Sequence, residues 1–374
     1  MHVLHIVGAR PNFMKVAPVY RALSQRPVRQ TLIHTGQHYD LNMAGVFFQQ
    51  LGIPTPDEDL AVGSGSHAQQ TAAIMTRVEP VLLQYRPDVV LVYGDVNSTV
   101  AAALVCAKLG TPIGHVEAGL RSFDRSMPEE VNRLVTDQLS DLLFTPSEDG
   151  NQNLLREGIA PEKILLVGNV MIDTLVRLLP LAIQTVATDL SRPYALLTLH
   201  RPSNVDDSAA LRPILSTLAD FAGELNILFP VHPRTRQRLQ EFGLDQYFDH
   251  GLRLLDPLPY LEFLGLQQSA TLVITDSGGI QEETTFLGIP CLTVRENTER
   301  PVTVTCGTNT LIGRDMDRLA TEIRRVLDGR AKTGTRPGLW DGHAGDRIAD
   351  SLLTWFQAPL EVGAETINNR SSLV

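Results

Sequence analysis

The chain has 374 residues, of which 43% are hydrophobic, and its formal net charge is −10 at pH 7. This length exceeds what one hydrophobic core usually supports, so we expect two domains, and the apolar content excludes a disordered or fibrous chain. The acidic balance argues against a protein that coats nucleic acid or an anionic membrane, which leaves a small molecule as the expected partner.

Short β-rich runs alternate with helical patterns from the first residue onwards. This alternation is typical of a parallel, doubly wound sheet covered by helices. The predicted strands of this part are 3–7, 31–34, 89–93, 113–116, 142–145 and 164–167. The predicted helices are 11–23, 66–83, 98–109, 128–140 and 148–157.

The same pattern then begins again and predicts a second α/β domain. Its predicted strands are 195–199, 227–231, 252–255, 272–275 and 291–294, and its helices are 209–222, 234–242, 260–268 and 280–287. We expect the break within 171–192, where a helical stretch gives way to Pro193. The predicted domains are therefore 1–170 and 171–343, with a helix over 344–358 that rejoins the first domain and a mobile tail over 359–374.

The first predicted strand leads into an anion site. It ends at Gly8, and Arg10 and Lys15 follow at the start of a helix that Pro11 favours. Backbone N–H groups at a helix start, with two cations beside them, bind anions, although a connecting loop with two solvated cations is the alternative. No GxGxxG follows the strand, so the fingerprint of a dinucleotide site is absent.

Acidic residues follow two other strands of the first domain. Asp95 comes after the strand 89–93 and serves either in the cleft between the domains or as an acidic residue at a helix start. Glu117 lies between a strand and a glycine loop where no cap is needed, which favours a functional role. Glu129 begins a helix, and helix-dipole physics alone would explain it.

A glycine turn follows the strand 272–275 in the second domain. Gly278 and Gly279 would let backbone N–H groups face a diphosphate closely, whereas Ser277 could instead be an ordinary helix cap. Glu283, one turn into the helix, either receives ribose hydroxyls or lies on a solvated helix face. Ligand chemistry is expected at the carboxyl ends of both sets of strands.

His200 and His232 each end a strand of the second domain, where a histidine could meet phosphate, although a lone histidine is more often structural. No HExxH or clustered Cys/His spacing indicates a metal, and no GxSxG indicates a serine nucleophile. Cys106, Cys291 and Cys306 sit among small or apolar neighbours and are interpreted as buried structural thiols.

Signals for a membrane or for export are absent from the sequence. No stretch approaches the roughly 18 apolar residues of a membrane span, and Gly8 comes too early for a signal-peptide core. We therefore expect a cytoplasmic protein.

Together and in this order, the motifs resemble those of the non-hydrolysing UDP-N-acetylglucosamine 2-epimerases, over most of the chain. The series is Gly8-Ala9-Arg10-Pro11, Thr35-Gly36-Gln37-His38, Gly94-Asp95, His115-Val116-Glu117-Ala118-Gly119-Leu120-Arg121, Pro128-Glu129-Glu130, His200-Arg201, Thr275-Asp276-Ser277-Gly278-Gly279-Ile280-Gln281-Glu282-Glu283 and Thr298-Glu299-Arg300-Pro301. The resemblance implies two Rossmann-like domains facing across a cleft, the GT-B-type architecture of one large class of glycosyltransferases. It also implies a homodimer that supplies precursors for cell-surface polysaccharides and needs neither metal nor nicotinamide.

The resemblance also implies roles for individual residues. The catalytic positions are Asp95, Glu117, Glu129 and His200. The positions that bind phosphates or the sugar are Arg10, Lys15, His232, Ser277, Gly278, Gly279 and Arg300, with Phe263 near uracil and Glu283 at the ribose. A second, activating substrate site falls at Gln37, Asp40, Gln69, Gln70 and Arg201. Asp40 stands where the family carries an amide and Gln69 where it carries a cation, which argues against activation by the substrate.

The chemistry of the implied substrate favours elimination. The hydrogen on carbon 2 of UDP-GlcNAc is not next to a carbonyl, so no enolate route is open. Departure of UDP from carbon 1 with loss of the carbon 2 proton gives a 2-acetamidoglucal, and re-addition gives UDP-ManNAc. The rivals are a hydrolysing epimerase, a glycosyltransferase, a non-catalytic nucleotide-sugar sensor, and an epimerase of 2,3-diacetamido uronic acid derivatives.

Overall fold

The computed structural model describes residues 1–36, 48, 50–182, 193–249 and 251–358. Gln37 and Asp40 of the expected second substrate site, and the expected tail 359–374, lie outside the described residues. Within the described residues the molecule is α/β and contains two parallel sheets, which confirms the predicted fold class.

The first sheet has the strand order β3-β2-β1-β4-β5-β6-β7 among the described residues. Its strands are β1 (His2–Val7), β2 (Arg29–His34), β3 (Glu58–Asp59), β4 (Val89–Tyr93), β5 (Ile113–Val116), β6 (Leu142–Thr145) and β7 (Ile164–Leu166). The accompanying helices are α1 (Arg10–Ser24), α3 (His67–Tyr85), α4 (Asn97–Leu109), α5 (Pro128–Leu139), α6 (Glu148–Arg156) and α7 (Val170–Leu178), with 3₁₀ turns η1 (Pro161–Lys163) and η2 (Leu179–Leu181). The sequence pattern does not predict β3, because two residues are too few to show an alternation.

The second sheet has the order β10-β9-β8-β11-β12-β13 among the described residues. Its strands are β8 (Tyr194–Thr198), β9 (Asn226–Pro230), β10 (Leu252–Leu255), β11 (Leu272–Thr275), β12 (Cys291–Thr293) and β13 (Asn309–Leu311). Its helices are α8 (Pro202–Val205), α9 (Ser208–Ala219), α10 (Pro233–Glu241), η3 (Asp245–Asp249), α11 (Tyr260–Ser269), α12 (Gly278–Leu287), α13 (Pro301–Thr305) and α14 (Met316–Leu327). The sequence analysis does not predict β13 or α14. A helix-start signal for α14 is nevertheless present in the sequence, because Asp315 caps the helix by accepting the Arg318 N–H at 2.8 Å.

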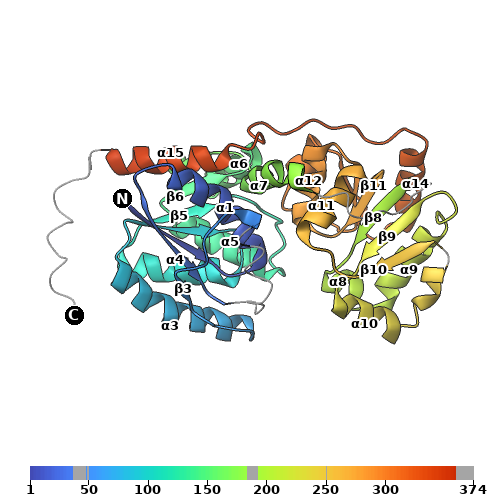
Figure 1. Ribbon diagram of the computed structural model, residues 1–374, viewed down its shortest axis with the longest axis horizontal. Coiled ribbons are helices and arrows are strands. Elements are labelled where there is room, and N and C mark those ends of the chain that lie inside the picture. The colour runs from blue at the N-terminus through green and yellow to red at the C-terminus, as the bar shows by residue number, and fades with distance from the viewer. Residues whose placement is uncertain (37–47, 49, 183–192, 250, 359–374) are drawn as a thin grey trace.

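The part of the molecule built on the first sheet is called the first half here, and the part built on the second sheet is called the second half. The last helix, α15 (Ala344–Gln357), packs against α1 of the first half, although the chain reaches it from the second half (Figure 1). Its apolar side chains Ile348 and Leu352 are fully buried in the core that surrounds β1. Gly345 allows the close approach of the two helices, because a Cβ there would lie 2.7 Å from the Pro18 carbonyl group. The carboxylate of Asp173 accepts the N–H groups of Ala344 at 3.1 Å and of Gly345 at 2.7 Å. The helix is therefore fixed to the first half at its start.

Two expectations about the surface can be compared with the described residues. Cys106 and Cys291 are buried as expected, but Cys306 is exposed, because it follows the last turn of α13 at the surface. No described helix combines the length and the apolar character needed to cross a membrane.

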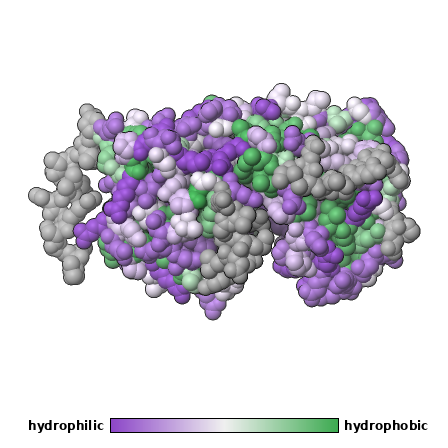
Figure 2. Space-filling model, in the orientation of Figure 1, coloured by the Kyte–Doolittle hydropathy of each residue, from purple (hydrophilic) through white to green (hydrophobic). Residues whose placement is uncertain are grey.

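Each sheet reverses its strand order once, between β1 and β4 in the first half and between β8 and β11 in the second. Loops that leave adjacent strands in opposite directions separate at such a point and form a ligand site at the carboxyl ends of the strands. The loops at these points begin at Gly8, Gly94, Leu199 and Asp276. The surface is hollowed between the two halves, and hydrophilic residues cover most of the coloured surface in this view (Figure 2).

Replacing Asp173 by Ala should destabilise the protein by about 2 kcal/mol, because two buried N–H groups at the start of α15 lose their acceptor. Urea unfolding measures the change. Asp350→Ala is the control on the same helix: its carboxylate pairs with Arg26 at 2.6 Å but is 69% exposed, so the loss should stay below about 1 kcal/mol. Equal losses would contradict the anchoring role of Asp173.

Candidate active site

Glu117 is the buried carboxylate that joins the two halves. It follows β5 with a left-handed backbone (φ 74°), an uncommon conformation for a residue with a side chain. Lys15, from α1, donates to Oε2, and Arg300, from the loop before α13 of the second half, donates to Oε1 at 3.1 Å. Burial raises the pKa of Glu117, but the Lys15 and Arg300 cations outweigh it and hold the pKa below the ordinary value. Gly94 leaves room for this contact, since a Cβ there would lie 2.5 Å from Lys15 Nζ.

Arg300 serves two further carboxylates. Its Nε lies 2.8 Å from Glu282 Oε1, and its Nη1 donates to Glu299 Oε1 at 2.5 Å. Glu299 also accepts from Arg295 at 2.7 Å. Burial raises the pKa of Glu282 to about 7. Glu299 is also buried, but Arg300 and Arg295 together hold its pKa well below the ordinary value.

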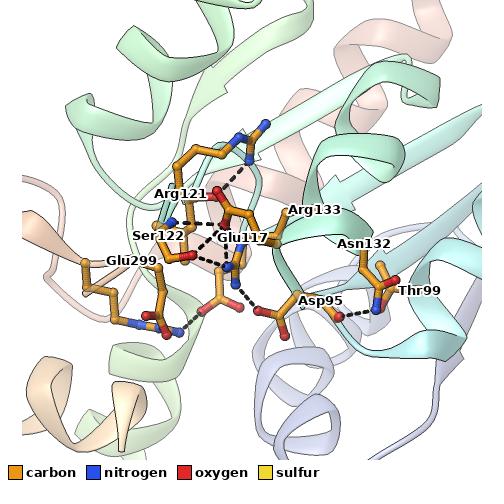
Figure 3. A network of polar contacts seen from close by, with 12 residues as sticks. Asp95, Thr99, Glu117, Arg121, Ser122, Asn132, Arg133 and Glu299 are labelled. Atoms are coloured by element: carbon orange, nitrogen blue, oxygen red, sulfur yellow. Dashed lines mark hydrogen bonds and ion pairs between the residues drawn. The ribbon is translucent and has the colours of Figure 1, made fainter. Parts of the chain in front are cut away.

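Asp95 is held by a guanidinium and does not cap a helix. Arg133 of α5 donates to its carboxylate at 2.5 Å, and Asn132 donates to its backbone carbonyl at 2.9 Å (Figure 3). The N-cap of α4 is Val96, without a side-chain capping bond, so Asp95 is not the cap of that helix. The second nitrogen of Arg133 binds Glu130 at 2.5 Å.

Glu130, rather than its neighbour Glu129, orders the loop after β5. Its carboxylate accepts the N–H groups of Ser122 and Phe123, both at 2.9 Å. Burial raises the pKa of Glu130, but the Ser122 N–H and the Arg133 cation lower it by more, so the pKa is below the ordinary value. Glu129 is half-buried, and its charge acts on Arg201 of the second half.

His200 is oriented by a buried acid. Its Nδ1 lies 2.8 Å from Asp276 Oδ1, and Asp276 also accepts the backbone N–H groups of His200 and Arg201. Burial raises the pKa of Asp276, but the His200 ring, the Arg201 N–H and the Asn204 side chain hold it below the ordinary value. A carboxylate at Nδ1 fixes the ring so that Nε2 is the nitrogen that can exchange a proton with a ligand.

The glycine turn before α12 packs against Arg300. Ser277 is the N-cap residue but makes no side-chain capping bond. A Cβ at Gly278 would lie 2.5 Å from Arg300 Nη1, so a side chain there would have to displace the guanidinium, whereas a Cβ at Gly279 would meet nothing closer than the Met171 methyl at 3.9 Å.

Glu283 is buried and does not lie on a solvated helix face, so that alternative is wrong. Tyr260 donates to its carboxylate at 2.8 Å, and burial raises the pKa of Glu283 to about 7.

Several predicted site residues lie apart from this cluster. His232 is exposed and caps α10, where its Nδ1 accepts the Arg234 N–H at 3.3 Å. Phe263 is partly buried against the apolar side of the second sheet. Gln69 is exposed in the first turn of α3, while Gln70 is buried and accepts from Asn97 at 2.8 Å. The side chain of Arg10 is not among the side chains that the structure describes.

In the part of the chain that the structure describes, no three His, Cys, Asp or Glu side chains are grouped so that they could hold a metal ion.

Six charged residues of this network had no role assigned from the sequence: Glu130, Arg133, Asp276, Glu282, Arg295 and Glu299. The sequence could have predicted one pair, because Glu130 and Arg133 are three residues apart on a predicted helix and therefore lie next to each other on its surface. Asp276 and Glu282 could not be found in this way, because their partners come from distant parts of the chain.

Comparisons with known proteins agree over nearly the whole chain. The sequence model of a family described as UDP-N-acetylglucosamine 2-epimerase matches residues 21–353. A UDP-N-acetylglucosamine 2-epimerase of Methanococcus maripaludis is 44% identical, covering 92% of this chain and 96% of the relative. A UDP-2,3-diacetamido-2,3-dideoxy-D-glucuronate 2-epimerase of Pseudomonas aeruginosa is 42% identical, covering 94% and 99%. The crystal structure of the Methanocaldococcus jannaschii UDP-GlcNAc 2-epimerase in complex with UDP-GlcNAc and UDP is similar with a TM-score of 0.85 at 41% identity, covering 95% of this chain and 100% of that one.

The neighbouring acids Glu129 and Glu130 should differ in their effect on stability. Glu130→Gln should cost about 2 kcal/mol, because Arg133 and two backbone N–H groups lose a buried carboxylate. Glu129→Gln, at a half-buried position, should change stability by less than about 0.5 kcal/mol. Urea unfolding of both variants measures this, and the reverse order would remove the ordering role from Glu130.

Proposed function

The chain belongs to the UDP-N-acetylglucosamine 2-epimerase family, and from this premise we propose that it interconverts UDP-GlcNAc and UDP-ManNAc without net hydrolysis. The reaction proceeds by elimination of UDP to a 2-acetamidoglucal and re-addition of UDP to that intermediate.

The observation that carries the proposal is the pair of cations at Glu117. Lys15 and Arg300 come from different halves and meet at one point, beside the glycine turn that opens α12. Helix N–H groups and two cations are the groups that a diphosphate prefers. A nucleotide-sugar whose diphosphate lies here would place its sugar against the carboxylates of the first half.

Elimination places negative charge on the β-phosphate oxygen as the bond to carbon 1 breaks. Lys15, Arg300 and the start of α12 stabilise that charge, and loss of one preorganised contact of this kind typically raises a barrier by about 3 to 4 kcal/mol. His200, fixed through Nδ1 by Asp276, protonates or orients the leaving diphosphate through Nε2.

The carbon 2 proton needs a base on one face of the sugar and an acid on the other. Asp95, Glu117 and Glu129 are the candidates, and a positioned proton transfer contributes roughly 100- to 10,000-fold. Glu117 is ionised while Lys15 and Arg300 hold it, so it begins the reaction as a base once the diphosphate has drawn these cations away.

The identity of the sugar is a finer point. The Pseudomonas aeruginosa relative, named for a 2,3-diacetamido glucuronate derivative, is 42% identical, close to the 44% of the Methanococcus relative. We favour UDP-GlcNAc. A homodimer, a cytoplasmic location, a role in polysaccharide precursor supply, and the division into domains 1–170 and 171–343 stay predictions.

Gly278→Ala should weaken UDP binding about tenfold or more, because the new methyl group displaces Arg300, the residue that faces the diphosphate. Isothermal titration calorimetry measures the affinity. Gly338→Ala is the control: it adds a methyl group where nothing lies within 4 Å, at a position that the candidate site does not include, and it should bind UDP as the parent protein does. Unchanged affinity in a folded Gly278→Ala protein would argue against this placement of the diphosphate.

In heavy water, deuterium should appear at carbon 2 of UDP-ManNAc and, with time, of recovered UDP-GlcNAc. The reason is that a proton held by a carboxylate exchanges with solvent before the sugar is rebuilt. Proton NMR of one reaction follows the label. An epimer that keeps its original hydrogen would rule out the elimination route.

The same experiment separates the rival functions. Free UDP with ManNAc in equal amounts would identify a hydrolysing enzyme, and binding without any conversion would identify a sensor. Faster conversion of a UDP-2,3-diacetamido uronate than of UDP-GlcNAc would change the assigned sugar.

A further inference from the structure

Charges in the Arg300 cluster are balanced before any ligand arrives. The cluster consists of the cations Lys15, Arg295 and Arg300 and the carboxylates Glu117, Glu282 and Glu299, joined by the contacts described above. Three cations therefore face three carboxylates in a largely buried space. A diphosphate that binds to Arg300 adds negative charge there, and a buried site of low polarity tolerates such an excess poorly.

Glu282 is the carboxylate of this cluster with the fewest partners. Its side chain is 1% exposed and meets Arg300 Nε through Oε1 at 2.8 Å. Its Oε2 is buried and has no hydrogen-bond partner among the described residues. Glu117 and Glu299, by contrast, each receive two cations, one on each oxygen.

We propose that Glu282 takes up a proton when the diphosphate of a UDP-sugar binds to Arg300, so that one of the two negative charges that the ligand brings to the cluster is offset. Glu282 is thus a positioning residue: it keeps Arg300 free to bind the ligand instead of competing for it. This inference rests on the proposed function, because it requires a diphosphate at Arg300.

The surroundings of Glu282 give the direction of the effect. Burial raises its pKa to about 7, and the Arg300 and Lys15 cations oppose that rise, while Glu117 adds to it. A diphosphate draws Arg300 and Lys15 towards itself and adds its own negative charge. Both changes favour the neutral acid, so the pKa of Glu282 rises further on binding.

Other groups near the ligand could exchange protons, and they can be told apart. Glu283 also has a pKa raised to about 7 by burial, but ribose hydroxyls that donate to it would favour its ionised form and release a proton. His200, whose Nδ1 lies against Asp276, is the second alternative. Asp149, whose pKa burial raises and the Arg300 charge lowers, is the third alternative.

The test is calorimetric titration of the protein with UDP-GlcNAc in buffers of different ionisation enthalpy. The difference in binding heat between buffers gives the number of protons taken up. Epimerisation itself takes up or releases no proton, and the diphosphate diester of the ligand does not titrate near neutral pH. Uptake approaching one proton per site is expected at about pH 8, falling towards zero at about pH 6, where Glu282 is already protonated. The affinity should accordingly fall with a slope of about threefold per pH unit at about pH 7, which approaches tenfold per unit above about pH 8.

Variants assign the proton. Glu282→Gln should bind UDP-GlcNAc without proton uptake and with little pH dependence, whereas Glu283→Gln, His200→Asn and Asp149→Asn should keep the uptake. Loss of uptake in any of the last three, or its retention in Glu282→Gln, would overturn the assignment.

If Glu282→Gln does not fold, the parent protein alone is sufficient for the test. Binding of UDP-GlcNAc with no proton uptake and with an affinity that does not change with pH would reject the inference while leaving the epimerase function intact. Failure of the parent protein to bind UDP-GlcNAc would reject both.

Discussion

The candidate active site depends on the ion pair that crosses between the halves, the contact of Glu117 with Arg300. Lys15 holds the other oxygen of the same carboxylate, so each half contributes a cation to one buried anion. A buried carboxylate is costly unless cations and hydrogen bonds compensate it, and neither half supplies both cations alone. The halves are therefore fixed relative to one another at the point where the chemistry is proposed.

The same requirement explains the polar network around this pair. Arg133 is almost fully buried and binds both Asp95 and Glu130, so the positions of these two acids are set by one guanidinium. Glu130 in turn holds two backbone N–H groups of the loop that follows Glu117. Asp95 and Glu117 thus have positions that are coupled through packed and hydrogen-bonded groups, as the two proposed proton transfers require.

The two halves provide different chemistry from similar sheets. The first half supplies carboxylates at the ends of β4 and β5, and the second supplies a helix start, Arg300 and the oriented His200. Glycine makes the contact between them possible, because Gly94 and Gly278 leave no side chain where Lys15 and Arg300 must approach. Each half also contributes a group of the other kind, because Lys15 lies beside the carboxylates of the first half and His200 lies beside the helix start of the second.

The sequence by itself determined the architecture and most of the candidate residues. Hydrophobic runs of strand length, glycine turns and helix-start residues are local signals, so β1, β4, β5, β8 and β11 and the loops after them could be predicted from neighbouring residues alone. The ordered motifs also indicated the family. Short elements such as β3 and β13 were beyond reach, because their pairing is decided by the adjacent strand and not by their own pattern.

Only the tertiary structure decided which of these groups meet. Lys15, Glu117 and Arg300 are separated by more than a hundred residues at each step, and no local pattern records that their charges compensate one another. Glu129 and Glu130 are adjacent and chemically alike, yet burial beside Arg133 gives Glu130 a structural part and leaves Glu129 facing the other half. The folded chain sets burial and the position of distant charges, and these two quantities determine whether a carboxylate is ionised, paired or available to react.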